Sequence, residues 1–160
     1  LAVVSSDKKL GLVAYRMTAE KAEKLWNMPE LHDGAASPIL SDGTVYAVVK
    51  GHALAANAAD GKVLWKGSVG GNGYTSPVLA DGKVIALIGK DLTVLDAAGK
   101  VEAEKLQPLA KWRAKFSAYT SPAVSDGKLY IRMHDGAACY DLTKVAPTER
   151  PAEEKEGKLR

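Results

Sequence analysis

The chain lacks the residues that mark several large protein classes. It has a single cysteine, Cys139, in 160 residues, which excludes an intrachain disulfide, a cysteine-rich zinc site and a c-type haem attachment. No apolar run approaches the roughly 20 residues that a membrane-spanning helix needs. The formal net charge is only +3, and charges of both signs are mixed along the chain. It is therefore no polycation built to bind phosphate backbones.

Large apolar side chains are also scarce. Aromatic residues make up 6% of the chain, there is one Phe, and 25 of the hydrophobic residues are Ala. Any core must therefore be built from Val, Leu and Ile, with a few Tyr and Trp. The length fits one domain or a piece of one.

What the sequence does contain is an internal repeat. A Ser-Pro pair followed by three residues and Asp-Gly begins at Ser37, Ser76 and Ser121, at spacings of 39 and 45 residues. Each copy continues into a β-type run, a short polar turn and a second β-type run. A partial copy precedes the first full one, because Trp26 and Trp65 both lie 11 residues before the next Ser-Pro pair. A repeat of about 40 residues with four short strands is typical of a β-propeller blade.

Local signals agree with this assignment. Asp-Gly between two short apolar runs predicts a two-residue hairpin, because a type I′ turn needs positive φ at both central positions. We label the strands of a blade A to D from the Ser-Pro pair onward. The sequence then predicts an all-β fold, a partial β-propeller of about 3.5 four-stranded antiparallel blades with about 14 strands. A helix is the weaker alternative for residues 18–26, where Ala, Glu and Lys have helical spacing.

The repeat also predicts the boundaries. These are a partial blade at 1–28, blades at 37–69 and 76–116, a partial blade at 121–144, and a disordered tail at 145–160. The tail holds two Pro and eight charged residues in sixteen, a composition that cannot bury a core. The first blade lacks strand A and the last lacks strand D. We therefore expect the chain to be the C-terminal part of a longer protein. The remainder of the propeller would come from missing sequence or another chain, and a homodimer is the second alternative.

Residues 55–65, Ala-Ala-Asn-Ala-Ala-Asp-Gly-Lys-Val-Leu-Trp, resemble the tryptophan-docking repeat of the PQQ-like (quinoprotein-type) β-propellers. The Ser-Pro-x-x-x-Asp-Gly segment resembles the A–B hairpin of the same family, and the resemblance spans about residues 1–144. It implies a ring of seven or eight blades. In such a ring Trp26 and Trp65 would pack between neighbouring blades, with Asn57 and Gly61 in the docking turn.

The second full blade departs from this pattern. The position equivalent to Trp65 is Ala103, and Trp112 comes nine residues later, within a repeat that is six residues longer. We expect strand D at 110–116 after a long C–D loop, so that Trp112 restores an aromatic near the outer edge. An insertion that contains Trp112 is the alternative.

The resemblance leaves two kinds of function. Some members are PQQ-dependent quinoprotein dehydrogenases with Ca²⁺ in the central channel, and others are non-catalytic scaffolds, among them a lipoprotein of the machinery that assembles outer-membrane β-barrels. The enzyme needs a carboxylate base and a set of oxygen ligands for Ca²⁺. Here the acidic residues that stand out have ordinary turn roles directly before Gly: Asp42, Asp60, Asp81 and Asp126.

We therefore expect a non-catalytic repeat scaffold that binds a partner protein or ligand, without a cofactor or metal. A fragment of a PQQ-dependent dehydrogenase is the enzyme alternative, and an envelope-associated structural propeller with carbohydrate contacts is the third. The resemblance implies a periplasmic, cell-envelope or extracellular location. Nucleic acid is not an expected partner. The alternating basic and aromatic residues at 111–115 are better explained as an exposed outer strand, whose charges prevent it from pairing with another chain.

Strand order predicts where a partner would bind. In an up-and-down blade the A–B and C–D turns lie on one face, and the B–C turns and long D–A connections lie on the other. Loops on a rigid scaffold are where binding residues usually sit. The residues expected on this long-loop face are Tyr74, Tyr119, His32, His52, His134 and Asn72. The alternative is that these are solvated loops, with the tyrosines packed over blade junctions. Cys139, in a C strand, is expected to be buried.

Overall fold

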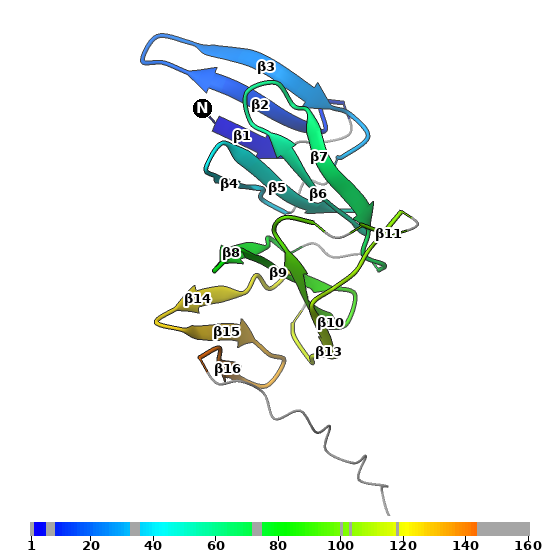
Figure 1. Cartoon of the computed structure of the whole chain (residues 1–160). Coiled ribbons are helices and arrows are strands. Elements are labelled where there is room, and N and C mark those ends of the chain that lie inside the picture. The colour runs from blue at the N-terminus through cyan, green and yellow to red at the C-terminus, as the bar shows by residue number, and fades with distance from the viewer. Residues whose placement is uncertain are drawn as a thin grey trace, which may run out of the picture.

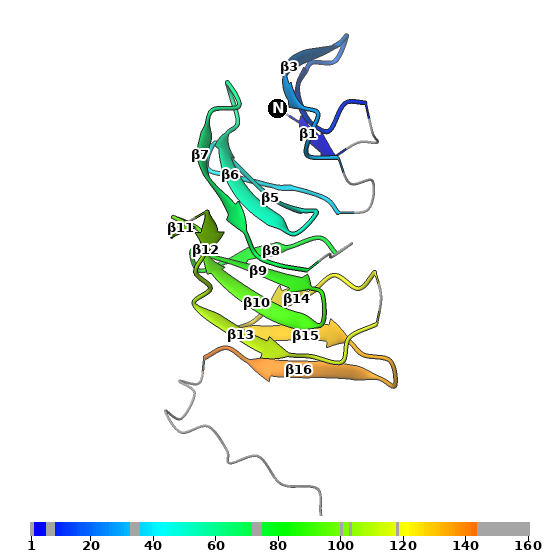
Figure 2. The same cartoon turned by 90° about the vertical axis from the view of Figure 1, so that its right-hand side faces the viewer.

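The computed structural model describes residues 2–5, 9–32, 36–71, 75–99, 101–102, 104–117 and 119–143. These residues form strands and turns, and none of them lies in a helix that could cross a membrane. Four sheets follow one another along the chain and stack in the same order (Figures 1 and 2). The predicted all-β partial propeller is confirmed. The predicted tail at 145–160 lies outside the described residues.

The first sheet has three antiparallel strands. In spatial order they are β1 (Ala2–Ser5), β2 (Leu12–Met17) and β3 (Ala22–Met28). The strand at Ala22–Met28 shows that the helical alternative for this segment is wrong. Its pairing with β2 satisfies the backbone groups that a helix would have satisfied internally.

The two complete blades have the predicted order A to D. The first contains β4 (Ile39–Ser41), β5 (Thr44–Val49), β6 (His52–Asn57) and β7 (Val63–Ser68). The second contains β8 (Val78–Ala80), β9 (Lys83–Ile88), β10 (Asp91–Asp96) and β13 (Ala110–Arg113). The last sheet contains β14 (Ala123–Ser125), β15 (Lys128–Arg132) and β16 (Ala137–Asp141).

The hairpins between strands A and B have the predicted geometry. Asp42, Asp81 and Asp126 have φ angles of 47°, 47° and 50°, and the glycine after each of them also has positive φ. These are the angles that a type I′ turn requires.

The core consists of three layers, one between each pair of neighbouring sheets. Alternate residues of one strand enter different layers because successive side chains of a strand point to opposite faces. In β5, Val45 and Val49 pack toward the first sheet, whereas Val48 packs toward the second full blade. This explains why the central strands read as nearly continuous apolar runs.

Trp65 lies in the layer between the two complete blades. It is 9% exposed, its indole Nε1 donates a hydrogen bond to the Ala97 carbonyl at 2.9 Å, and its ring lies 6.3 Å from that of Tyr46. A Cβ added at Gly99 would come within 2.3 Å of the Trp65 ring. The neighbouring Leu64 is 55% exposed.

Trp26 makes two of these contacts one blade earlier, with a backbone carbonyl and with a glycine. Its Nε1 donates to the Ala58 carbonyl at 2.9 Å, and a Cβ added at Gly61 would lie 2.9 Å from its ring. Asn57 shapes this turn, because its Oδ1 accepts a hydrogen bond from the Ala59 amide at 2.8 Å. Trp112 has a different contact: it is 37% exposed and meets Tyr140 of the next sheet edge-on at 6.1 Å.

The six extra residues of the second repeat form a structure that the strand count of 14 missed. The structure has 16 strands in its described residues, and the two additional ones are β11 (Val101–Glu102) and β12 (Lys105–Leu106). β12 pairs in parallel with β7 of the preceding blade, and the Ser68 amide donates to the Glu104 carbonyl at 2.9 Å. We call β11, β12 and residues 107–109 the strap.

The expectation that Cys139 is buried is wrong, because this thiol is exposed. Cys139 stands opposite Tyr130 on β15, which is itself 41% exposed. The alternate residues Leu129 and Ile131 enter the layer shared with the second full blade. Cys139 therefore lies on the face of this sheet that points away from the other blades.

Candidate partner-binding surface

The strand order gives each blade two rims. We call the rim that carries the A–B and C–D turns the turn rim, and three equivalent hydrogen bonds hold these turns together. The amides of Ala58, Ala97 and Leu142 donate to the carbonyls of Gly43, Gly82 and Gly127, at 2.8, 2.9 and 2.8 Å. The turns of this rim are short, and three of them are Asp-Gly pairs. On it, a hydrogen bond from Lys83 and the charge of that ammonium lower the pKa of Asp81 below its ordinary value.

The opposite rim carries the B–C turns and the D–A connections, and we call it the loop rim. Its loops pack against one another across the blades. The Val69 amide donates to the Gly51 carbonyl at 2.9 Å, and a Cβ added at Gly71 would lie 3.3 Å from Gly89. Thr75 is 4% exposed and donates its hydroxyl to the Leu87 carbonyl at 2.8 Å. These contacts fix the described parts of the loop rim to the blades.

Two of the three histidines meet one lysine on the loop rim. His32 Nδ1 lies 3.1 Å from the Pro29 carbonyl, so the neutral ring donates there and offers Nε2 as an acceptor. Lys50 Nζ lies within hydrogen-bond distance of that Nε2. His52 Nδ1 lies 3.1 Å from the Lys50 carbonyl. Lys50 was not among the predicted surface residues, although the sequence placed it in a B–C turn.

The third histidine lies two blades further along the chain. His134 is exposed in the B–C turn of the last sheet, and the D–A connection before that sheet runs beside it. The Ser117 amide donates to the Arg132 carbonyl at 3.2 Å, and its hydroxyl to the Met133 carbonyl at 2.8 Å. Tyr119, in the same connection, is 73% exposed with φ of 60°, a conformation that a tyrosine rarely adopts.

The remaining predicted surface residues, Asn72 and Tyr74, lie outside the described residues. His32 and His52 meet at Lys50, whereas His134 belongs to another blade. Within the described part of the chain, no three His, Cys, Asp or Glu side chains gather as a metal site would require. The loop rim thus offers hydrogen-bonding and cationic groups, which suit contacts with another macromolecule.

A hollow of about 410 Å³ opens beside His52. Lys66, Ser68, Glu104 and Lys105 also line it, so it lies between β7 and the strap. Sequence reasoning missed this hollow, because the strap is positioned by pairing with a different blade. The only local signal was the longer spacing of 45 residues between Ser76 and Ser121.

Sequence reasoning also missed a ladder between the Ser-Pro motifs. The Ser37 amide donates to Ser76 Oγ at 2.8 Å, and the Ser76 amide donates to Ser121 Oγ at 3.0 Å. These two bonds link each of the three Ser-Pro motifs to its neighbour along the chain. The repeated serine was visible, but its contact partner was not.

A family model for PQQ-like repeats, described as outer membrane protein assembly factor BamB, matches residues 9–136. The chain belongs to this family. The match covers β2 and β3 of the first sheet, both complete blades, and β14 and β15 of the last sheet, so the repeats described above are PQQ-like propeller repeats. No curated protein matches the sequence.

One solved structure agrees with the fold. BamB from Moraxella catarrhalis superposes with a TM-score of 0.54 at 19% identity, over 89% of this chain and 46% of that protein. Quinohemoprotein alcohol dehydrogenases from Pseudomonas putida HK5 and Comamonas testosteroni each give a TM-score of 0.47 at 19% identity, over 67% of this chain and 19% of theirs. The chain therefore spans about half the length of the BamB structure.

Proposed function

We propose that this chain forms part of a non-catalytic propeller scaffold of the cell envelope, which acts in outer membrane protein assembly by binding a partner protein on the loop rim. The observation that carries the proposal is the family match over residues 9–136, because the family is described as an outer membrane protein assembly factor. The same description supports a location in the cell envelope, and we propose the periplasm.

The geometry of the loop rim supports a binding role. The D–A connections are longer than the turns of the opposite rim, and hydrogen bonds hold their described parts to B–C turns and strands. Lys50, His52 and Tyr119 lie on this rim and are exposed. Rigid presentation of such groups limits the entropy that a partner must overcome when it binds.

The residues described here do not fit the PQQ and Ca²⁺ of the dehydrogenase alternative. Several of their carboxylates serve turns and ion pairs: Asp60 and Asp96 cap C–D turns through the amides of Lys62 and Ala98, and Asp91 pairs with Lys111. Asp42, Asp81 and Asp126 lie in the hairpins of the turn rim. We therefore derive no step through a quinone.

Deletion of the gene in the organism of origin tests the proposal. We expect lower amounts of assembled β-barrel proteins in the outer-membrane fraction, restored by the full-length wild-type gene. Lys50→Gln on the loop rim should restore less than the matched turn-rim variant Lys83→Gln. Unchanged outer-membrane proteins after deletion would overturn the proposal. Dye reduction by the purified full-length protein with an alcohol, PQQ and Ca²⁺ would also overturn it, in favour of the dehydrogenase.

A further inference from the structure

The strap covers the outer side of the junction between the two complete blades. Leu106 is 5% exposed and belongs to the apolar layer between these blades. A Cβ added at Gly67 would lie 3.0 Å from Leu106 Cγ, so the strap rests directly on β7. The Leu109 amide donates to the Val94 carbonyl at 2.8 Å. This bond joins the end of the strap to β10 of the second complete blade.

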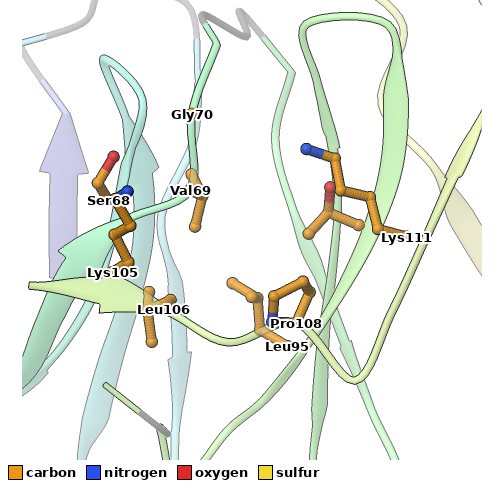
Figure 3. A pocket seen from close by; sticks show the side chains of 9 residues that line it. Ser68, Val69, Gly70, Leu95, Lys105, Leu106, Pro108 and Lys111 are labelled. Carbon is orange, nitrogen blue, oxygen red and sulfur yellow. The ribbon is translucent and has the colours of Figure 1, made fainter. Parts of the chain in front are cut away.

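A pocket of about 250 Å³ lies between the strap and the two blades (Figure 3). Apolar side chains of Val69, Leu95, Leu106 and Pro108 line it. Figure 3 shows Lys105 on one side of this group and Lys111 on the other. The pocket thus combines an apolar floor with two cations, which come from the strap and from β13.

The two lysines differ in their partners. Lys111 Nζ lies 3.2 Å from the carboxylate of Asp91, a residue that holds Lys111 in place and does not line the pocket. Lys105 has no ion-pair partner among the residues that the structure describes. The ammonium group of Lys105 is therefore fully available to a ligand, whereas Lys111 would share its charge between a ligand and Asp91.

Thr93 gives an independent sign of a ligand. It lines the pocket and is 1% exposed, and its hydroxyl has no hydrogen-bond partner among the described residues. Leu54, 39 residues earlier, holds the equivalent place in the preceding blade and is fully buried in an apolar layer. A buried hydroxyl without a partner is costly. The second blade therefore has an unpaired polar group at a position where the first blade has leucine.

We propose that this pocket binds the C-terminal residue of a partner peptide. The peptide carboxylate would be bound by Lys105 and Lys111, with Thr93 as a further donor, and an apolar last side chain would lie on the floor. Ammonium groups form strong charge-assisted hydrogen bonds with carboxylates. A C-terminal residue fits a pocket of this size because it carries a carboxylate and an apolar side chain together. This site borders the loop rim through Val69 and Gly70, but the proposal does not depend on the function proposed for that rim.

Fluorescence polarisation with the full-length protein tests the site. The probe is a fluorescein-labelled octapeptide that ends in Leu with a free carboxylate, compared with the same peptide amidated at its C-terminus. We expect saturable binding of the free acid, and at least about tenfold weaker binding of the amide. Equal binding of acid and amide would overturn the proposal, as would no binding of either. Hexanoate should compete only weakly, and competition as strong as that of unlabelled peptide would identify a small organic acid instead.

Variants separate a ligand site from a structural role. Lys105→Gln should weaken peptide binding about tenfold, whereas Lys128→Gln, an exposed lysine in another sheet, should not change it. Thr93→Val should weaken binding while leaving the thermal midpoint unchanged or higher, because it removes an unpaired hydroxyl. Thr75→Val, which removes a hydroxyl that is hydrogen-bonded, should lower the midpoint and leave binding unchanged. Peptide binding that neither Lys105→Gln nor Thr93→Val alters would contradict the proposal.

Discussion

Trp65 donates its indole N–H to the Ala97 carbonyl at 2.9 Å, 32 residues further along the chain. Trp26 makes the same bond to Ala58 at the same distance and the same separation. One tryptophan thus fastens each blade to the turn of the next, at two successive junctions. The contact repeats because it depends on two local features, a Leu-Trp pair in strand D and a turn that ends in Gly-Lys.

Truncation of this tryptophan should be costly. Trp65→Ala is expected to lower the free energy of unfolding by about 3–5 kcal/mol, because it removes a large buried side chain and leaves a cavity. Chemical denaturation followed by circular dichroism measures the change. Leu64→Ala is the control, since Leu64 is 55% exposed, and should cost under about 1 kcal/mol. Equal losses for the two variants would mean that Trp65 does not support the junction.

The turn beneath Trp65 gives a second prediction. Gly99 and Gly82 have φ of 74° and 64°, but only Gly99 would place a Cβ against a ring, whereas Gly82 has nothing within 4 Å. Both alanine variants pay for positive φ, about 1 kcal/mol. Gly99→Ala should cost about 1–3 kcal/mol more because of the clash. Thermal unfolding of the two variants side by side checks this, and identical midpoints would contradict it.

The serine ladder predicts a polar contribution to blade stacking. Ser76→Ala removes the acceptor of the Ser37 amide and should lower stability by about 1–2 kcal/mol. Ser125→Ala is the matched control, because the hydroxyl of Ser125 donates to the exposed carboxylate of its neighbour Asp126 and not to another blade among the residues that the structure describes. Amide hydrogen exchange at Ser37 should accelerate in Ser76→Ala and stay unchanged in the control. No change in either variant would show that the ladder contributes nothing.

The strap should depend on one apolar anchor. Leu106→Ala is expected to cost about 2–4 kcal/mol, because Leu106 is buried between the blades. Leu109→Ala lies in the same segment but is 56% exposed, and should cost under about 1 kcal/mol. Limited proteolysis at the strap should speed up only in Leu106→Ala. Equal protease resistance in both variants would show that Leu106 does not hold the strap.

Most of the fold could be predicted because its determinants are local. The Asp-Gly pairs set positive φ at Asp42, Asp81 and Asp126, and period-two apolar runs between such turns leave few alternatives to antiparallel strands. The predicted burial of Cys139 is the exception, because this thiol is exposed. Its neighbours Ala138 and Tyr140 are half-buried, so alternation along the strand places Cys139 outward.

The remaining features depend on contacts between distant segments. The strap pairs Lys105 with Ser68 of another blade, and nothing in residues 101–106 specifies that partner. The contact of His32 with Lys50 likewise joins a D–A connection to a B–C turn. Strand order predicted which rim each residue belongs to, but not which side chains meet there.

Site-specific photo-crosslinking tests the central claim, that the loop rim is the partner surface. A photoreactive phenylalanine analogue is placed at Tyr119 on the loop rim, or at Asp126 on the turn rim, in the full-length protein expressed in its organism of origin. Both positions are exposed. We predict a covalent adduct with a protein of outer membrane assembly from position 119 and none from position 126. Equal adducts from both positions, or no adduct from position 119, would contradict the account.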